Sequence, residues 1–117
     1  MISVVFEQNT DKGILCFRIN GHAGFGCYGN DVVCASASIL AYTVAKTISF
    51  MYEEGKLVKK PNVRLKEGDA VITCKPKAEF YAEALHTYFV AEVGYSLLAQ
   101  SYPQYVEIQP FGKPTEA

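Results

Sequence analysis

The chain lacks several features that define whole classes of protein. It has no tryptophan, no Cys-x-x-Cys pair among its four cysteines, and a formal net charge of only −1 at neutral pH. Without a Cys-x-x-Cys pair, zinc fingers and thioredoxin-like redox proteins lose their usual signature. A near-neutral charge argues against a general binder of the phosphate backbone, which normally presents a basic face. We therefore expect no direct nucleic-acid partner.

Targeting and membrane signals are also missing. The segment from Met1 to Phe6 has no basic residues and no small-residue cleavage site, so it does not resemble a secretory signal. The sequence shows no apolar run of transmembrane length. We expect a cytoplasmic protein with no membrane partner. Its cysteines are then expected to be reduced thiols rather than a disulfide framework.

What is present fits one globular domain over residues 1–117, because half of the residues are hydrophobic and a fifth are charged. Hydrophobic periodicity and turn residues predict hairpins followed by helices. The expected ranges are strands at 2–8 and 14–19, a helix at 31–54, strands at 62–65 and 70–75, a helix at 77–100, a strand at 105–109 and a frayed tail from 111. The order ββα-ββα-β indicates an α+β fold with a mainly antiparallel sheet and two long helices.

Apolar residues in these elements fall on single faces. Three of these faces, on the first two strands and the first helix, are predicted to pack into the core. Their residues are Ile2, Val4 and Phe6; Leu15, Phe17 and Ile19; and Val33, Ala37, Leu40, Val44, Ile48 and Met51. On the second helix, the residues on one line are Leu85, Phe89, Val93 and Leu97.

Residues 21–38 carry the most chemistry. A loop there contains four of the nine glycines, Gly21, Gly24, Gly26 and Gly29. No Gly-Lys-Ser/Thr follows them, so they do not form a phosphate-binding loop, and we predict a flexible flap. His22 lies in this loop, Asp31 introduces the helix, and Cys34 falls in its first turn. Helix N-terminal amides favour a thiolate, and an imidazole can take its proton. Cys34 and His22 are thus candidates for acyl transfer, although a packed cysteine and a structural histidine are ordinary alternatives.

The other candidate residues, near Cys34 or of the same types, have these interpretations. Asn30 or Asp31 can cap the helix, and Asp31 can also orient His22. Ser38 can hydrogen-bond near the thiol or, as we favour, act as a small packing residue. Cys27 could join His22 and Cys34 at a zinc ion, but the spacing matches no compact zinc motif, so we expect no metal and no cofactor. Cys16 and Cys74 fall in expected strands and are predicted to be packed thiols, and His86 to be structural or on the surface.

One run of residues resembles a known family, the ribosomal-processing cysteine proteases called Prp. The resemblance covers about seventeen residues and rests on fixed spacing among His22-Ala23-Gly24, Gly29, Asp31, Val33-Cys34-Ala35 and Ser38. Val32, Ala37 and the Gly26-Cys27 pair depart from the usual family pattern.

The resemblance implies a small homodimeric α+β protease of the kind found in Firmicutes and related bacteria. Such enzymes remove a short N-terminal extension from the precursor of the large-subunit ribosomal protein that reaches toward the peptidyl-transferase centre, cutting after an aromatic residue. The family's nucleophile corresponds to Cys34 and its general base to His22, with supporting positions at Asp31 and Ser38. The alternative is a non-catalytic, ribosome-associated binding module.

Overall fold

The computed structural model describes residues 1–21 and 31–112. Its elements follow the predicted order, ββα-ββα-β, with a short 3₁₀ turn at Ala78–Phe80 before the second helix. They are β1 (Ile2–Asn9), β2 (Ile14–Asn20), α1 (Val32–Glu53), β3 (Asn62–Lys66), β4 (Asp69–Cys74), α2 (Tyr81–Ser101) and β5 (Val106–Gln109). The predicted α+β class is confirmed.

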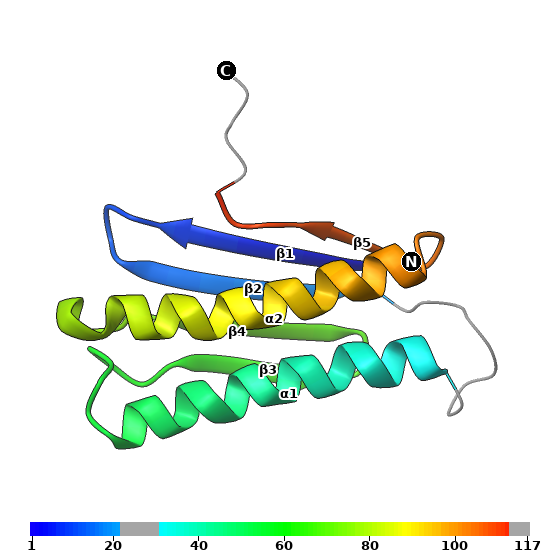
Figure 1. Cartoon of the computed structure of the whole chain (residues 1–117). Helices are drawn as coiled ribbons and strands as arrows, with labels where there is room; N and C mark the ends of the chain where they lie inside the picture. Colours follow the sequence, from blue (N-terminus) through cyan, green and yellow to red (C-terminus); the bar gives the residue numbers. More distant parts are fainter. Residues whose placement is uncertain (22–30, 113–117) are drawn as a thin grey trace.

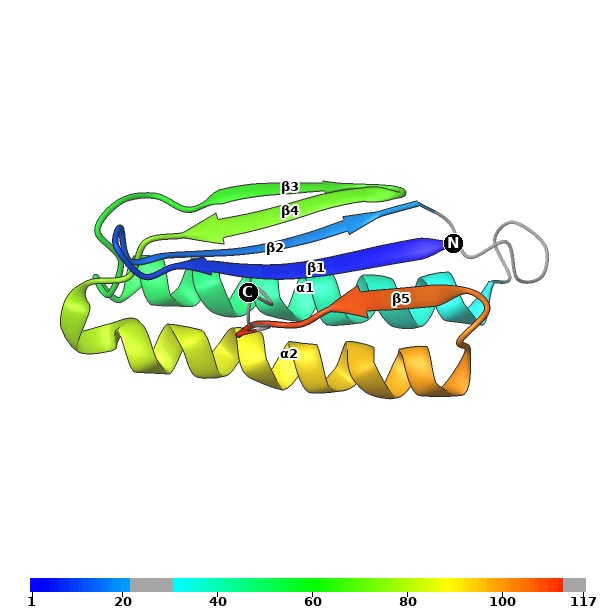
Figure 2. The same cartoon turned by 90° about the horizontal axis from the view of Figure 1, so that it is seen from above.

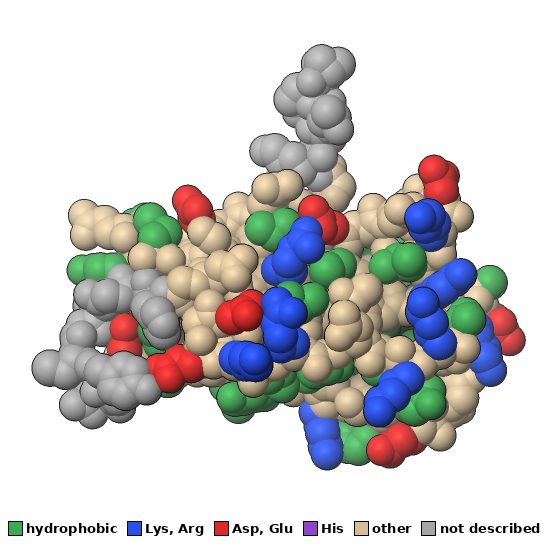
Figure 3. All heavy atoms as spheres, turned by 180° about the vertical axis from the view of Figure 1, so that it is seen from behind, with side chains coloured by type: hydrophobic (Ala, Val, Ile, Leu, Met, Phe, Trp, Pro, Cys, Tyr) green, Lys and Arg blue, Asp and Glu red, His purple; other side chains and the backbone are tan. Residues whose placement is uncertain are grey.

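The five strands form one sheet in the order β3-β4-β2-β1-β5. All neighbouring pairs are antiparallel except β1 and β5, which run parallel. Both helices lie on the same face of this sheet, with α1 beneath the β3–β4 side and α2 beneath the β1–β5 side (Figures 1 and 2). The opposite face carries scattered Lys, Arg, Asp and Glu side chains (Figure 3).

The alternation of the strands places the core on the helix side of the sheet. The predicted apolar lines of β1 and β2 are buried, and they include Phe6 and Phe17, whose rings stack with centroids 4.7 Å apart. The opposite side of the same strands carries polar pairs such as Arg18 with Glu7. The alternation of apolar and polar side chains along each strand therefore decides which face of the sheet the helices cover.

The predicted apolar line of α1 is also confirmed, with Leu40 half-buried and the other five residues buried. By length and composition α1 could cross a membrane, since its best 18-residue window has a mean hydropathy of 1.5. The expectation that no apolar run reaches this length is therefore wrong. A core helix passes the same test, and α1 buries seven residues in the structure.

The apolar line noted on α2 is not its core face. Phe89, Val93 and Leu97 are each more than 40% exposed. The side facing the sheet instead carries small residues and tyrosines, namely Ala84, Tyr88, Ala91 and Tyr95. The buried hydroxyls have acceptors: Tyr88 donates to the Ile72 carbonyl at 3.0 Å and Tyr95 to the Ala37 carbonyl at 2.6 Å. These hydrogen bonds offset the free-energy cost of burying the two tyrosine hydroxyl groups.

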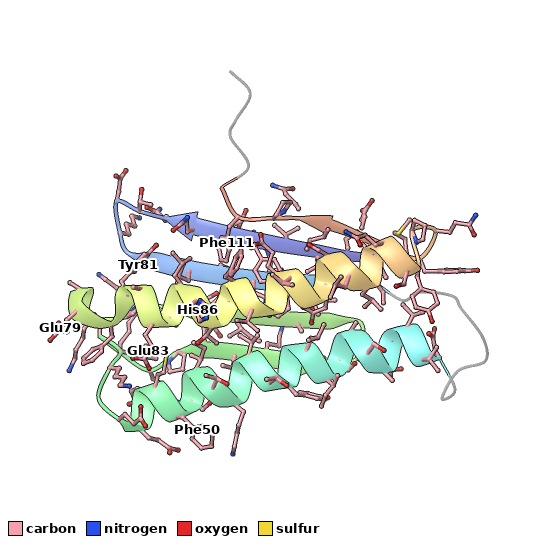
Figure 4. All side chains as sticks on the ribbon, viewed as in Figure 1. Phe50, Glu79, Tyr81, Glu83, His86 and Phe111 are labelled. Atoms are coloured by element: carbon pink, nitrogen blue, oxygen red, sulfur yellow. The ribbon has the colours of Figure 1, made fainter. Side chains whose placement is uncertain are left out.

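Phe111 corrects the expectation of a frayed tail that begins there. Its ring contacts Phe6 and Tyr88, with centroid separations of 5.2 and 6.1 Å. Its backbone N–H donates to the buried carboxylate of Glu92. Phe111 therefore lies against α2 at the β1 side of the sheet (Figure 4).

Candidate functional site

The first turn of α1 is organised by Asp31. This residue has an extended backbone (φ −81°, ψ 105°), and its Oδ1 accepts hydrogen bonds from the N–H groups of Val33 at 2.9 Å and Cys34 at 3.0 Å. The Asp31 carbonyl oxygen accepts the Ala35 N–H at 3.0 Å. The capping interpretation of Asp31 is thus confirmed, and it fixes the backbone that carries the Cys34 thiol.

Cys34 is half-buried and lines a pocket of about 60 Å³ at one end of the sheet. Ser38 lies one turn further along α1 and lines the same pocket. Its side chain is exposed, and whether it packs or hydrogen-bonds near the thiol remains a prediction. The apolar walls of the pocket include Ile2, Ile19 and Leu65. The pocket therefore presents a thiol beside apolar walls.

Gly21 forms the β2 side of this pocket. Its φ is +98°, and a Cβ at this position would lie 2.3 Å from the Met1 carbonyl oxygen. Its N–H donates to the Gly68 carbonyl in the β3–β4 turn at 2.9 Å. No L-residue with a side chain fits here without a shift of the Met1 backbone. These contacts fix the position of the backbone at Gly21, directly after β2.

His22, Gly24, Gly26 and Gly29 lie outside the described residues. The pairing of Cys34 with His22, and the flap formed by the loop glycines, remain predictions. Cys27 also lies outside the described residues. Within residues 1–21 and 31–112, no three His, Cys, Asp or Glu side chains gather as a metal site.

Of the other described cysteines, Cys74 is packed in the core, as predicted, whereas Cys16 is only half-buried. Cys16 accepts a hydrogen bond from the Thr73 hydroxyl at 3.3 Å. Cys74 is buried, and the Tyr88 hydroxyl lies 3.6 Å from its sulfur. Burial raises the pKa of Cys74 to about 11. This thiol is thus a poor nucleophile near neutral pH.

The chain matches a known protein family. The family model of the cysteine protease Prp matches residues 1–107. The chain belongs to the Prp family. A ribosomal processing cysteine protease Prp from Bacillus subtilis (strain 168) is 35% identical over 48 residues, which cover 41% of this chain and 43% of that relative.

Solved structures share the Prp fold. One is the ribosomal processing protease Prp from S. aureus with a covalently linked product peptide, which has a TM-score of 0.69 and 22% identity and covers 95% of this chain and 99% of its own. Another is SMU.848 from Streptococcus mutans, with a TM-score of 0.65, 23% identity, and coverage of 93% and 92%. The S. aureus protease with a substrate peptide has a TM-score of 0.63 and 20% identity, with coverage of 95% and 99%.

One side of the Cys34 pocket, the β3–β4 turn, was not predicted from the sequence. Lys66, Gly68 and Asp69 line the pocket with Cys34, although 35 residues separate Cys34 from Asp69 in the sequence. The turn itself was predicted, but its place beside Cys34 follows from strand pairing, in which Asn20 is opposite Asp69. Strand order was needed to find these residues.

Proposed function

We propose that this chain is a cytoplasmic cysteine endopeptidase with Cys34 as its nucleophile and His22 as its general base. The observation that carries the proposal is the position of Cys34, in a capped first helical turn at the wall of an apolar pocket. Family membership supports the same chemistry. The other described thiols lack this combination, since Cys74 is enclosed in the core and Cys16 lies on a strand.

In the proposed reaction the Cys34 sulfur attacks the carbonyl carbon of the scissile peptide bond. The C–N bond breaks, the leaving amine takes the proton held by the His22 imidazolium, and a thioester remains on Cys34. Water, deprotonated by the same imidazole, then hydrolyses the thioester and restores the thiol. Neither metal nor cofactor is part of this proposal.

The proposed substrate is the N-terminally extended precursor of the large-subunit ribosomal protein near the peptidyl-transferase centre. We propose that the cut follows an aromatic residue, whose side chain suits the apolar walls formed by Ile2, Ile19 and Leu65. The solved S. aureus protease is named as a ribosomal processing protease and was captured with substrate and product peptides. These relatives support the same substrate class here.

We also propose that the protein is a homodimer that pairs through its helix layer. This layer exposes large apolar side chains from both helices, including Ile39, Phe50, Phe89, Val90 and Leu97, each at least 49% exposed. His86 lies in the second turn of α2, and its ring centroid is 6.4 Å from that of Phe89 (Figure 4). If the layer pairs, Val90→Glu should produce monomers in sedimentation velocity, while its circular dichroism spectrum stays that of the folded wild type. A wild-type monomer at micromolar concentration would rule out the dimer.

The decisive test mixes the purified protein with the extended precursor and measures intact masses. We expect one truncated product, absent with Cys34→Ala and nearly absent with His22→Ala. Cys27→Ser is the matched thiol control and should keep its activity. A bound but intact precursor would favour the binding-module alternative, and full activity of Cys34→Ala would refute the proposed nucleophile.

A further inference from the structure

Strand β3 is an open edge of the sheet that leads directly to the Cys34 pocket. It pairs with β4 on one side and is the terminal strand of the five. Its last two residues, Leu65 and Lys66, line the pocket. At roughly 3.3 Å per residue, its five residues offer an edge about 16 Å long. No strand among the described residues covers that edge.

The hairpin register determines which backbone groups face outward. β3 and β4 are joined by the two-residue turn Glu67-Gly68, and Lys66 is opposite Asp69. In such a hairpin the residues flanking the turn form a hydrogen-bonded pair, and alternate residues then turn their N–H and C=O groups away from the partner strand. Val63 and Leu65 are the residues that present backbone groups to the free edge.

The side chains beside this edge differ between the two faces of the sheet. On the helix side, Leu65 is half-buried against the core and Val63 is 37% exposed. Tyr42 of α1 lines the same pocket and is 53% exposed. On the opposite side, Arg64 is half-exposed and forms an ion pair with Asp69 at 3.1 Å. Lys66, two residues further along the strand, lies on the same side as Arg64. An added strand would meet apolar groups on one face and basic groups on the other.

We propose that one flank of the peptide substrate adds to β3 as a sixth strand, which delivers its scissile bond to Cys34. This inference rests on the proposed endopeptidase function. The occupant is an extended peptide with apolar side chains toward Val63 and Leu65, and acidic or neutral side chains toward Arg64 and Lys66. Main-chain bonds supply affinity in this binding mode, and alternate side chains supply selectivity. The short length and basic charge of β3 also discourage its pairing with another copy of itself.

A backbone N-methyl scan of a cleavable peptide tests the proposal with the wild-type enzyme. Peptide N–H groups that bond to β3 must alternate with N–H groups that point away. On one flank of the scissile bond, we expect methylation at every second position to lower kcat/KM about tenfold, because it removes one bond and adds a clash. Methylation at the intervening positions should change kcat/KM less than about twofold. The flank that shows the alternation is the one on β3, and a flat scan on both flanks overturns the proposal.

A matched pair of enzyme variants tests the same contact from the other side. Val63→Pro removes an outward N–H without breaking a bond to β4, which edge strands tolerate. Val63→Ala removes the same apolar side chain but keeps the N–H. We expect Val63→Pro to cleave the long peptide about fivefold more slowly than Val63→Ala. Both should cleave a short peptide that lacks the pairing flank at equal rates. Equal rates on the long peptide would contradict strand addition.

These experiments separate the inference from the function on which it rests. If the wild-type enzyme cleaves neither the long nor the short peptide, and the precursor also stays intact, the endopeptidase proposal fails. If the long peptide is cleaved but the scan is flat, the protease remains and strand addition to β3 is wrong. The scan uses unmodified enzyme, so it stays decisive even if Val63→Pro does not fold.

Discussion

Replacing Asp31 by Ala should destabilise the protein by removing the acceptor at the start of α1. Two N–H groups lose their partner, those of Val33 and Cys34. N-cap substitutions of this kind cost about 0.5–2 kcal/mol. The upper half of this range applies because Val33 is fully buried, which hinders water from replacing the lost acceptor. We therefore expect the free energy of unfolding to fall by about 1–2 kcal/mol.

Asp31→Asn is the matched control, because an amide oxygen caps a helix about as well as a carboxylate oxygen. Its free energy of unfolding should stay within about 0.5 kcal/mol of the wild-type value. Urea denaturation followed by circular dichroism measures the free energy of unfolding of both variants, and in a thermal scan the Ala variant should melt roughly 4–8 °C lower. If Ala and Asn lower stability equally, the carboxylate charge rather than the cap is responsible. If neither changes it, the capping argument is refuted.

Three further predictions concern the framework around the site. Gly21→Ala should lose about 2–3 kcal/mol of stability in urea denaturation, from its left-handed backbone and the steric clash, whereas Gly13→Ala, at φ +67° with open space around it, should lose only about 1 kcal/mol. Tyr95→Phe should lose about 1 kcal/mol, because the Ala37 carbonyl loses a buried donor, and an unchanged urea midpoint would contradict this. Finally, Cys74 has a folded pKa of about 11 against an ordinary 9.0, so between these pH values the unfolded state releases a proton that the folded state keeps. Stability is then complete below pH 9 and falls as the pH rises to 11, by up to about 2–3 kcal/mol. Cys74→Ala should reduce the slope between pH 9 and 10, and the slope that remains comes from buried tyrosines, whose pKa burial also raises.

The parts of the fold that were predictable are those that depend on local pattern. Strand alternation identified the buried faces of β1 and β2, because a side chain on a strand can face only one of two sides. Asp31 before an apolar run identified the cap, and Cys34 three residues later followed from it. Both features involve residues close together in the sequence.

The core face of α2 was not predictable, because two lines on this helix are apolar. One carries Phe89 and Leu97, and the other carries Tyr88 and Tyr95 with alanines between them. Hydrophobicity alone favours the first line. The second is buried because its hydroxyls reach carbonyl acceptors on β4 and α1, which only the tertiary structure supplies. The β3–β4 side of the site was missed for the same reason, since strand order brings Asp69 to Cys34.

The hydrogen bonds of Asp31 also bear on how the proposed reaction stabilises its transition state. Acyl transfer places negative charge on the substrate carbonyl oxygen, and amides aimed at that oxygen lower the barrier. The N–H groups of Val33, Cys34 and Ala35 are natural donors near the sulfur, but all three already donate to Asp31. The donors for the oxyanion must then come from other groups, unless Asp31 releases one of these amides when substrate binds.

The activity of Asp31→Asn tests which role matters most. With the capping bonds preserved, we expect kcat/KM for the precursor to stay within about threefold of wild type, since the transition-state donors lie elsewhere. A carboxylate that orients the His22 imidazole would behave differently, because the amide cannot stabilise the imidazolium formed when the thiol is deprotonated. A loss of about 100-fold or more in a variant of unchanged stability would therefore assign Asp31 to the proton-transfer machinery. Measuring kcat/KM and the urea midpoint on the same preparation separates the two roles.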